Sequence, residues 1–121
     1  MQALARREGS GDWLMGGVVA YHRDVKHGLL GVTDDVVVSA NAACQMASGA
    51  RAALGAGLGI AVTGAGGPEP QDGQPPGTVW IAVDDGGAPV SALLRLSGDP
   101  EQVCIDSVAG ALSFATERLQ H

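Results

Sequence analysis

Two short apolar runs, each bounded by glycine, constrain the fold of this chain most strongly. They are Leu58–Val62 and Thr78–Val83. Apolar runs of this length fit strands that are buried on both faces, as in a sheet covered by helices on each side. A Gly/Pro-rich stretch of about fourteen residues, Gly64–Gly77, separates them. A loop of that length in a compact domain is often functional.

Helix signals lie before and after these runs. Ser39 stands at an N-cap position ahead of a predicted helix that ends near Leu54, where Gly55 follows. Asp99 and Pro100 begin a second helix, because they suit its N-cap and its first position. Its predicted apolar face recurs at spacings of three and four: Ile105, Val108, Leu112, Ala115 and Leu119.

Weaker signals complete the outline. Trp13–Tyr21 favours a strand, and Arg23–Leu30 favours a short helix that ends at Gly31. Val90–Leu96 is predicted to form an antiparallel hairpin with the strand before it. Helices that alternate with buried strands predict an α/β class, here one domain over residues 1–121 with three α/β/α layers around a mixed β-sheet. The order of the strands stays open.

The composition excludes several classes of protein. The chain has 121 residues, a net charge of −6 and a pI near 4.7, so a basic footprint for nucleic acid is missing. No apolar run approaches the roughly 20 residues of a membrane span. No secretory signal is visible, so the expected compartment is the cytoplasm. Cys44 and Cys104 have neither disulfide-framework nor zinc spacing, so we predict two buried small side chains and no metal site.

Cations gather in one short segment of this acidic chain, at the predicted junction of a strand and a helix. The segment runs from Tyr21 to His27 and contains Arg23 and Lys26; Tyr21 is the only tyrosine and Lys26 the only lysine. Such a patch suits a small anion such as a phosphate, and a lysine kept neutral in a pocket can act as a general base. The alternative is a solvated helix start with an ordinary surface lysine.

A second candidate binding site follows the apolar run Leu58–Val62. Thr63-Gly64-Ala65-Gly66-Gly67-Pro68 has glycines whose backbone N–H groups can approach an anion, and a threonine hydroxyl beside them. It is not a dinucleotide fingerprint, because Glu69 takes the place of the third glycine, and no Lys-Ser or Lys-Thr pair makes it a P-loop. An ordinary turn is the alternative.

Several short blocks of this sequence resemble the CinA C-terminal domain family, and they occur in the same order as in that family. The first blocks are Gly16-Gly17-Val18-Val19-Ala20-Tyr21, then Lys26, then Leu29-Leu30-Gly31-Val32. The later ones are Val38-Ser39, Ala61-Val62-Thr63-Gly64 with Gly66 and Pro68, Pro76-Gly77-Thr78-Val79-Trp80, and Ser97-Gly98-Asp99. The resemblance extends from about Gly9 to Leu119.

The resemblance implies a reaction and a set of site residues. The family hydrolyses the carboxamide of nicotinamide mononucleotide to the nicotinate nucleotide and ammonia, with no cofactor, through a serine nucleophile that a lysine activates beside a tyrosine. By position, Tyr21 and Lys26 correspond to that tyrosine and lysine. Thr63, Gly64 and Gly66 would line the nucleotide pocket, and Arg23 would supply a cation for the phosphate.

The chain departs from the family pattern in two places. The family's serine lies in an A-E-S-C-T-G-G motif, roughly a strand and a helix before the tyrosine, and this sequence does not contain that motif. The two arginines of the family's G-D-R-x-x-V-R are replaced in Gly98–Cys104. One hypothesis is therefore an amidohydrolase domain that is N-terminally truncated relative to the family and inactive as this chain. The other is a non-catalytic module that binds a nucleotide or assembles as a homo-oligomer.

Overall fold

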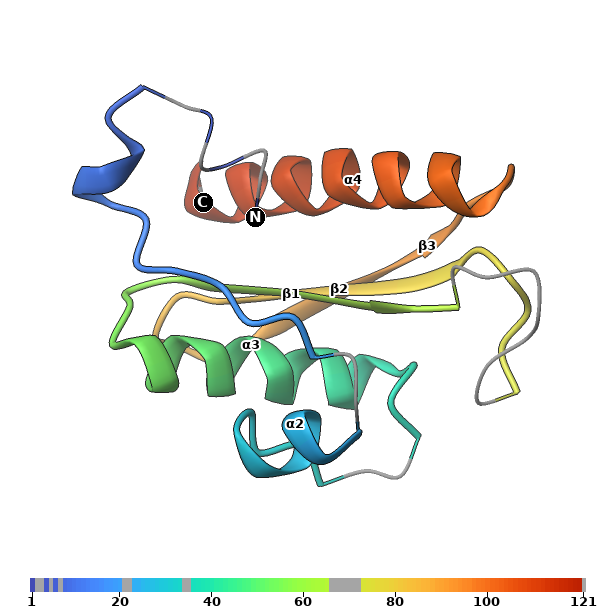
Figure 1. The fold of residues 1–121 in the computed structure, drawn as a ribbon, viewed down its shortest axis with the longest axis horizontal. Helices are drawn as coiled ribbons and strands as arrows, with labels where there is room; N and C mark the ends of the chain where they lie inside the picture. The colour runs from blue at the N-terminus through green and yellow to red at the C-terminus, as the bar shows by residue number, and fades with distance from the viewer. Residues whose placement is uncertain are drawn as a thin grey trace.

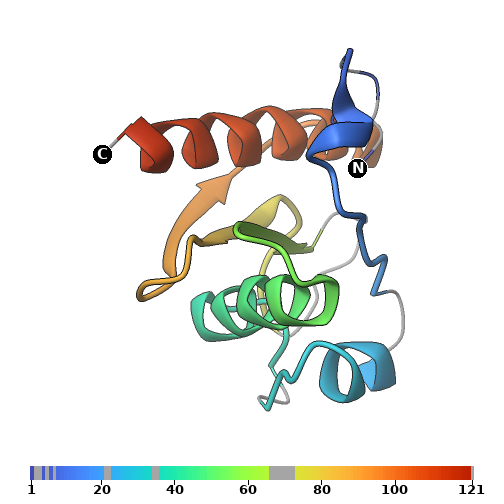
Figure 2. The same ribbon diagram turned by 90° about the vertical axis from the view of Figure 1, so that its left-hand side faces the viewer.

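The structure is a computed structural model that describes residues 1, 4, 6, 8–20, 23–33, 36–65 and 73–120. Its layers are visible in Figure 1: a sheet lies between helix α3 (Ala40–Leu54) and helix α4 (Pro100–Gln120). The short helix α2 (Arg23–Gly28) lies beyond α3, away from the sheet (Figure 2). The predicted α/β/α arrangement is confirmed.

The described sheet has three strands in the order β1-β2-β3. They are β1 (Gly59–Gly64), β2 (Thr78–Asp84) and β3 (Val90–Arg95), and both neighbouring pairs are antiparallel. β2 is buried on both faces, as predicted, because it is the central strand and has a helix on each side. β1 is buried mainly on its α3 side, so the expectation of two buried faces is wrong for this edge strand.

Helix α3 begins and ends where the sequence predicts. The Ser39 hydroxyl accepts a hydrogen bond from the Ala42 N–H at 3.1 Å, and Gly55 ends the helix with a left-handed φ of 61°. The face toward the sheet is small: Ala42, Ala43, Met46 and Ala47 are buried. A methyl group on Gly59 would overlap the Ala47 carbonyl oxygen. Small residues therefore let α3 approach β1 closely.

Helix α4 has the predicted N-cap but a different buried face. The Asp99 carboxylate accepts a hydrogen bond from the Gln102 N–H at 2.8 Å. The side that packs on the sheet contains Val103, Ser107 and Ala111, whereas Ile105 is 56% exposed. A Cβ atom on Gly110 would lie 2.6 Å from the nearest Leu94 side-chain carbon, so the helix contacts the sheet along a face of small residues. Of the predicted apolar face only Ala115 is buried; Val108 and Leu119 are exposed and Leu112 is half-buried.

The N-terminal part contains a 3₁₀ turn, Ser10–Asp12, followed by a segment that alternates in burial but belongs to no strand of the described sheet. From Leu14 to Ala20, even-numbered residues are half-buried and odd-numbered residues are exposed. This is the period of a β-strand. The strand predicted for Trp13–Tyr21 is thus present only as an alternation in burial, since this segment pairs with no strand of the described sheet. Tyr21 itself lies outside the described residues.

Both aspartates of the β2–β3 turn stabilise it by accepting hydrogen bonds from backbone N–H groups. Asp84 accepts from the Gly86 N–H at 2.8 Å, and Asp85 accepts from the Gly87 N–H at 3.2 Å. Asp84 is buried, and the Ser48 hydroxyl on α3 also donates to it. These two hydrogen bonds, with the Arg51 charge nearby, hold the pKa of the Asp84 carboxyl below its ordinary 3.8.

Replacing Asp84 by asparagine is expected to lower the free energy of unfolding by about 1 kcal/mol at neutral pH. A carboxyl whose pKa is lower in the folded than in the unfolded state stabilises the fold at pH values above its unfolded-state pKa, near 3.8. This stabilisation disappears as the pH falls through the folded-state pKa. The difference between the two proteins should therefore shrink below about pH 4 in urea unfolding curves. Asp85→Asn is the control and should change stability less, since Asp85 is exposed; a pH-independent difference for Asp84→Asn contradicts the assignment.

Candidate functional site

Lys26 lies on α2, and backbone contacts fix that helix to the chain that follows it. The Val32 N–H donates to the Lys26 carbonyl oxygen at 3.0 Å, and His27 Nδ1 donates to the Val32 carbonyl oxygen. Leu30 and Val32 are both buried, at 4% and 2% exposure. The end of α2 is therefore held by a hydrogen-bonded turn whose apolar side chains are part of the core.

Helix α3 provides the surface against which this turn packs. A methyl group on Gly49 would overlap the Leu30 carbonyl oxygen, so the turn contacts the backbone of α3 directly. Gln45, one turn earlier on α3, accepts from the Thr33 N–H at 2.9 Å and donates to the Thr33 hydroxyl at 2.8 Å. Lys26, which is half-buried, is thus placed by α3 through the residues at 30–33.

Thr63 and Gly64 lie together at the end of β1. Thr63 is 4% exposed, and its hydroxyl donates to the Val37 carbonyl oxygen at 2.7 Å. The proton of this hydroxyl is used inside the protein, while its oxygen can still accept a hydrogen bond. Gly64 is confined by β2, since a Cβ atom there would lie 2.9 Å from a Val79 methyl carbon. Tight packing against β2 is thus a sufficient physical reason for a glycine at position 64.

Three backbone hydrogen bonds close the base of the loop that follows β1. The Ala65 N–H donates to the Thr78 carbonyl oxygen at 2.9 Å, and the Gly77 N–H donates to the Ala65 carbonyl oxygen at 2.7 Å. The Leu96 N–H donates to the Gly77 carbonyl oxygen at 2.8 Å. The loop base is therefore joined to the end of β3, which leads to Asp99 at the start of α4.

The structure places the predicted site residues in two groups. Lys26 is on α2, on the far side of α3 from the sheet, whereas Thr63 and Gly64 end β1 (Figures 1 and 2). Arg23 is the first residue of α2. Tyr21 and Gly66 lie outside the described residues, so the predicted pairing of Tyr21 with Lys26 stays a prediction.

Sequence reasoning missed a shallow hollow on the outer face of α3, beside the turn at Leu30. It has a volume of about 400 Å³, and Asn41, Gln45 and Ser48 of α3 line it together with Leu30. These three polar residues recur at spacings of four and three, opposite the buried alanines of the same helix, so the amphipathic pattern of α3 contained this signal.

Other sequence expectations can be compared with the described residues. Cys44 is half-buried and Cys104 is exposed, so the prediction of a buried Cys104 is wrong; it lies on the outer side of α4. Among the described residues no group of three or more His, Cys, Asp or Glu side chains gathers where a metal ion could bind. In the same part of the chain, every helix is too short or too polar to cross a bilayer.

Comparison with known proteins identifies the relatives of this chain. It is 38% identical over 117 residues to a competence-damage inducible protein of Desulforamulus reducens, a match that covers 93% of this chain and 28% of that protein. It is 35% identical over 126 residues to the nicotinamide-nucleotide amidohydrolase PncC of Pseudomonas putida, covering 96% of this chain and 79% of that protein. The chain spans about a quarter of the length of most of these relatives, the P. putida protein excepted.

Solved structures agree with the sequence relatives. The competence damage-inducible protein A (ComA) of Klebsiella pneumoniae superposes with a TM-score of 0.92 at 33% identity, covering 99% of this chain and 78% of that one. A CinA superfamily protein of Escherichia coli gives a TM-score of 0.86 at 35% identity, covering 93% of this chain and 69% of that one. The family described as the CinA C-terminal domain matches residues 1–119. The chain therefore belongs to the CinA C-terminal domain family.

Proposed function

We propose that this chain takes part in the hydrolysis of the carboxamide of nicotinamide mononucleotide, giving nicotinate mononucleotide and ammonia. The observation that carries the proposal is its relationship to the P. putida amidohydrolase, which is 35% identical and matches 96% of the chain. A shared fold alone does not establish a shared reaction. The proposal therefore depends on the residues that would do the chemistry.

Lys26 is the residue that we assign to proton transfer. It is half-buried on a helix that the Val32 and His27 hydrogen bonds hold in place. A lysine can act as a general base when its surroundings favour the neutral amine, and a fixed position lowers the entropic cost of reaction. We assign Tyr21 to orienting or relaying the proton, as the family resemblance implies.

The remaining candidates are assigned to nucleotide binding. Arg23 begins the same helix as Lys26 and would supply a cation for the phosphate, with a charge-assisted hydrogen bond. Thr63 and Gly64, with Gly66, would contact the nucleotide at the end of β1, where the Thr63 oxygen can still accept a hydrogen bond.

The second candidate function is a module that binds the nucleotide without cleaving it. The sequence contains no A-E-S-C-T-G-G motif, and a serine–lysine mechanism without its serine lacks the covalent step. We therefore propose that these 121 residues bind nicotinamide mononucleotide but do not release ammonia unaided. We locate this activity in the cytoplasm and propose that the assembled protein is a homo-oligomer.

Calorimetric titration and an ammonia assay test both candidates on the same protein. We expect nicotinamide mononucleotide to give a saturable heat, with affinity lowered about tenfold by Arg23→Met, which removes the cation assigned to the phosphate. Arg23→Lys keeps the positive charge and should keep most of the affinity. Any ammonia release should fall by at least about 100-fold in Lys26→Ala.

Three outcomes contradict these assignments. A flat titration at millimolar nucleotide, together with no ammonia release, overturns both functions. Ammonia release that survives Lys26→Ala overturns the role of the lysine. Equal binding of adenosine monophosphate overturns nicotinamide recognition and leaves only a phosphate contact.

A further inference from the structure

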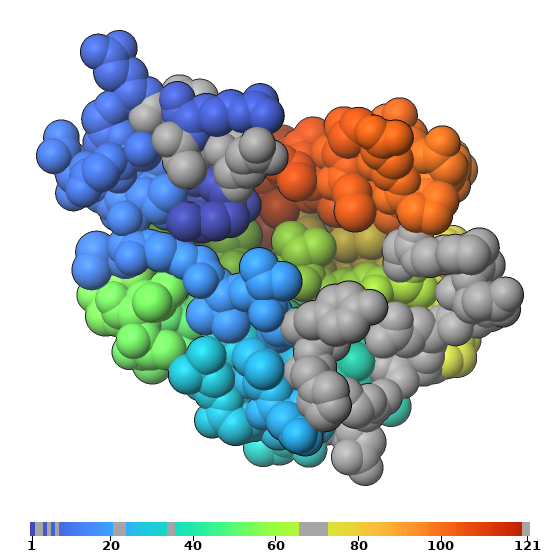
Figure 3. All heavy atoms as spheres, viewed as in Figure 1, coloured from blue at the N-terminus to red at the C-terminus, as the bar shows by residue number. Residues whose placement is uncertain are grey.

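The direction in which Lys26 points depends on how a very short helix is held. Helix α2 has six residues, and isolated helices shorter than about 12 residues are marginal in water. Its atoms lie at the surface of the molecule in Figure 3, and its residues Asp24 and Gly28 are exposed. Contacts with the rest of the chain must therefore fix its place and its rotation about its own axis.

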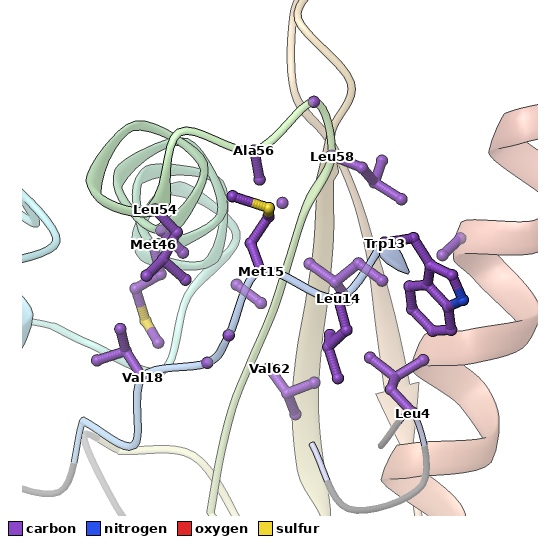
Figure 4. A pocket seen from close by; sticks show the side chains of 18 of the residues that line it. Leu4, Trp13, Leu14, Met15, Val18, Met46, Leu54, Ala56, Leu58 and Val62 are labelled. Atoms are coloured by element: carbon purple, nitrogen blue, oxygen red, sulfur yellow. The ribbon is translucent and has the colours of Figure 1, made fainter. Parts of the chain in front are cut away.

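The chain approaches α2 without support from the sheet. Residues 14–18 run toward the helix along the wall of an apolar groove of about 640 Å³, where Figure 4 shows Leu14, Met15 and Val18. This segment pairs with no strand of the described sheet. Strand pairing within the described residues therefore does not fix the start of α2, and the contacts at its end gain importance.

Val32, shortly after the end of α2, is a fixed point in the core. Its side chain is 2% exposed and packs with the buried alanines of α3. Gly31 has a φ of 72°, which turns the chain back alongside α2. Gln45 of α3 holds the next residue, Thr33, through two hydrogen bonds. The backbone of Val32 is thus restrained on both sides, and so is any group that bonds to it.

Both backbone groups of Val32 bond back to α2, at two successive residues. Its N–H donates to the Lys26 carbonyl oxygen at 3.0 Å, and its carbonyl oxygen accepts from Nδ1 of His27. A single bond would act as a pivot, whereas two bonds fix the rotation of the helix. Successive residues of a helix point about 100° apart, so a rotated α2 would swing the Lys26 side chain away from its present direction.

We propose that His27 is a positioning residue, whose ring holds Lys26 in the orientation that the amide hydrolysis needs. This inference rests on the role of Lys26 in the proposed function. His27 acts through the rotation of α2 and needs no contact with the substrate. A catalytic group that is misplaced by about 1 Å can lower a rate about 100-fold, so one hydrogen bond that sets the direction of Lys26 has a large effect.

The hydrogen bond also specifies the tautomer of the His27 ring. A carbonyl oxygen can only accept, so the bond to Val32 requires a hydrogen on Nδ1. In the neutral ring the other nitrogen, Nε2, then carries the lone pair. Nitrogen-15 chemical shifts distinguish a protonated from an unprotonated ring nitrogen, so the bond has a spectroscopic signature of its own.

Two amide substitutions give a matched comparison at position 27. His27→Asn places an amide N–H close to the position of Nδ1 and should keep the bond to Val32. His27→Gln carries the same amide one methylene group farther out and should lose the bond. Glutamine is the better helix former, so an effect of helix propensity alone would rank the two variants in the opposite order.

The single lysine of the chain makes the measurement selective. Reductive methylation with carbon-13 formaldehyde labels the amine of Lys26 and the N-terminal amine only. We expect the Lys26 methyl signal of His27→Gln to move toward its position in the urea-unfolded chain, and that of His27→Asn to stay near the signal of the unmodified sequence. Hydrogen exchange at the Val32 amide should be about tenfold faster in His27→Gln than in His27→Asn.

Asp99→Ala is the control for a general loss of stability. It removes the carboxylate that accepts from the Gln102 N–H at the start of α4, on the opposite face of the sheet from α2 (Figure 1). The variant should unfold at lower urea concentration and leave the Lys26 signal where it is.

Three results would overturn the proposal. One is a nitrogen-15 spectrum of the unmodified chain in which the neutral His27 ring has its hydrogen on Nε2. Another is an equal Lys26 signal and equal Val32 exchange in His27→Asn and His27→Gln. A third is that Asp99→Ala moves the Lys26 signal as far as His27→Gln does. The nitrogen-15 measurement needs no substitution, so it tests the bond even if a variant does not fold.

Adding nicotinamide mononucleotide separates this proposal from the proposed function. If both hold, the nucleotide shifts the Lys26 signal of the unmodified sequence and of His27→Asn, and shifts that of His27→Gln less. An equal shift in the two variants overturns the positioning role. If the nucleotide shifts no signal while the nucleotide-free differences persist, His27 still positions Lys26 and the proposed function fails.

Discussion

Gly49→Ala is expected to lower the free energy of unfolding by about 3 kcal/mol, and the melting temperature by about 10 °C. In an open helix position the same change stabilises a protein, because alanine has the higher helix propensity by about 1 kcal/mol. The sign is reversed here because a methyl group would overlap the Leu30 carbonyl oxygen, and backbone cannot move aside as a side chain can. Either α3 or the turn at Leu30 must shift.

The same substitution should affect nucleotide binding, since the Leu30 turn positions α2. The Lys26 carbonyl oxygen accepts from Val32, so a displaced turn moves the helix that carries Lys26. Gly28→Ala is the matched control: Gly28 is the last residue of α2, and no atom lies within 4 Å of a Cβ atom placed there. Thermal unfolding and calorimetry on both variants test this. An increase in the melting temperature of Gly49→Ala would contradict the packing.

Local signals in the sequence predicted the ends of the helices well. Ser39, Gly55 and Asp99 act through contacts within a few residues, so their roles can be inferred without knowing the fold. The buried face of α4 was predicted wrongly because the helix has two apolar stripes. The contact of Gly110 with Leu94 brings the side with Val103 and Ala111 onto the sheet, and that contact joins distant parts of the chain.

The N-terminal strand shows a different limit of sequence reasoning. Its alternating pattern is found from Leu14 to Ala20, but a strand exists only where a neighbour provides hydrogen bonds. The described sheet provides none, because β1 pairs with β2 alone. A pattern with a period of two therefore identifies residues able to pair and cannot supply their partner.

For the candidate site, composition and family resemblance led to Lys26, Thr63 and Gly64, but not to the contacts that hold them. Thr63 donates to Val37, which is 26 positions away in sequence, and a contact at that separation depends on the packing of β1 beside the residues before α3. The hydrogen bond of His27 to Val32 spans five residues but depends on the fold of the turn. The chemical type of a site residue is thus easier to predict from the sequence than the contacts that hold it in place.

Gly77→Ala is expected to have the largest effect of any substitution considered, with a loss of about 4 kcal/mol in the free energy of unfolding. Gly77 has a φ of +89°, which costs an alanine about 1–2 kcal/mol. In addition, a methyl group would overlap the Leu96 carbonyl oxygen. The hydrogen bonds of Gly77 with Ala65 and Leu96 close the loop base, so both should weaken.

Gly73→Ala separates the two causes, because Gly73 has a φ of +76° with open space around its Cβ position. It should lose only the conformational part, about 1–2 kcal/mol. Urea unfolding measures both variants, and hydrogen exchange at Gly77 and Leu96 reports on the loop base. If the two variants lose equal stability, the contact with Leu96 contributes nothing beyond backbone conformation. A larger loss in Gly77→Ala, with faster exchange at Leu96, means that this contact holds the end of β3 against the base of the loop beside Thr63 and Gly64.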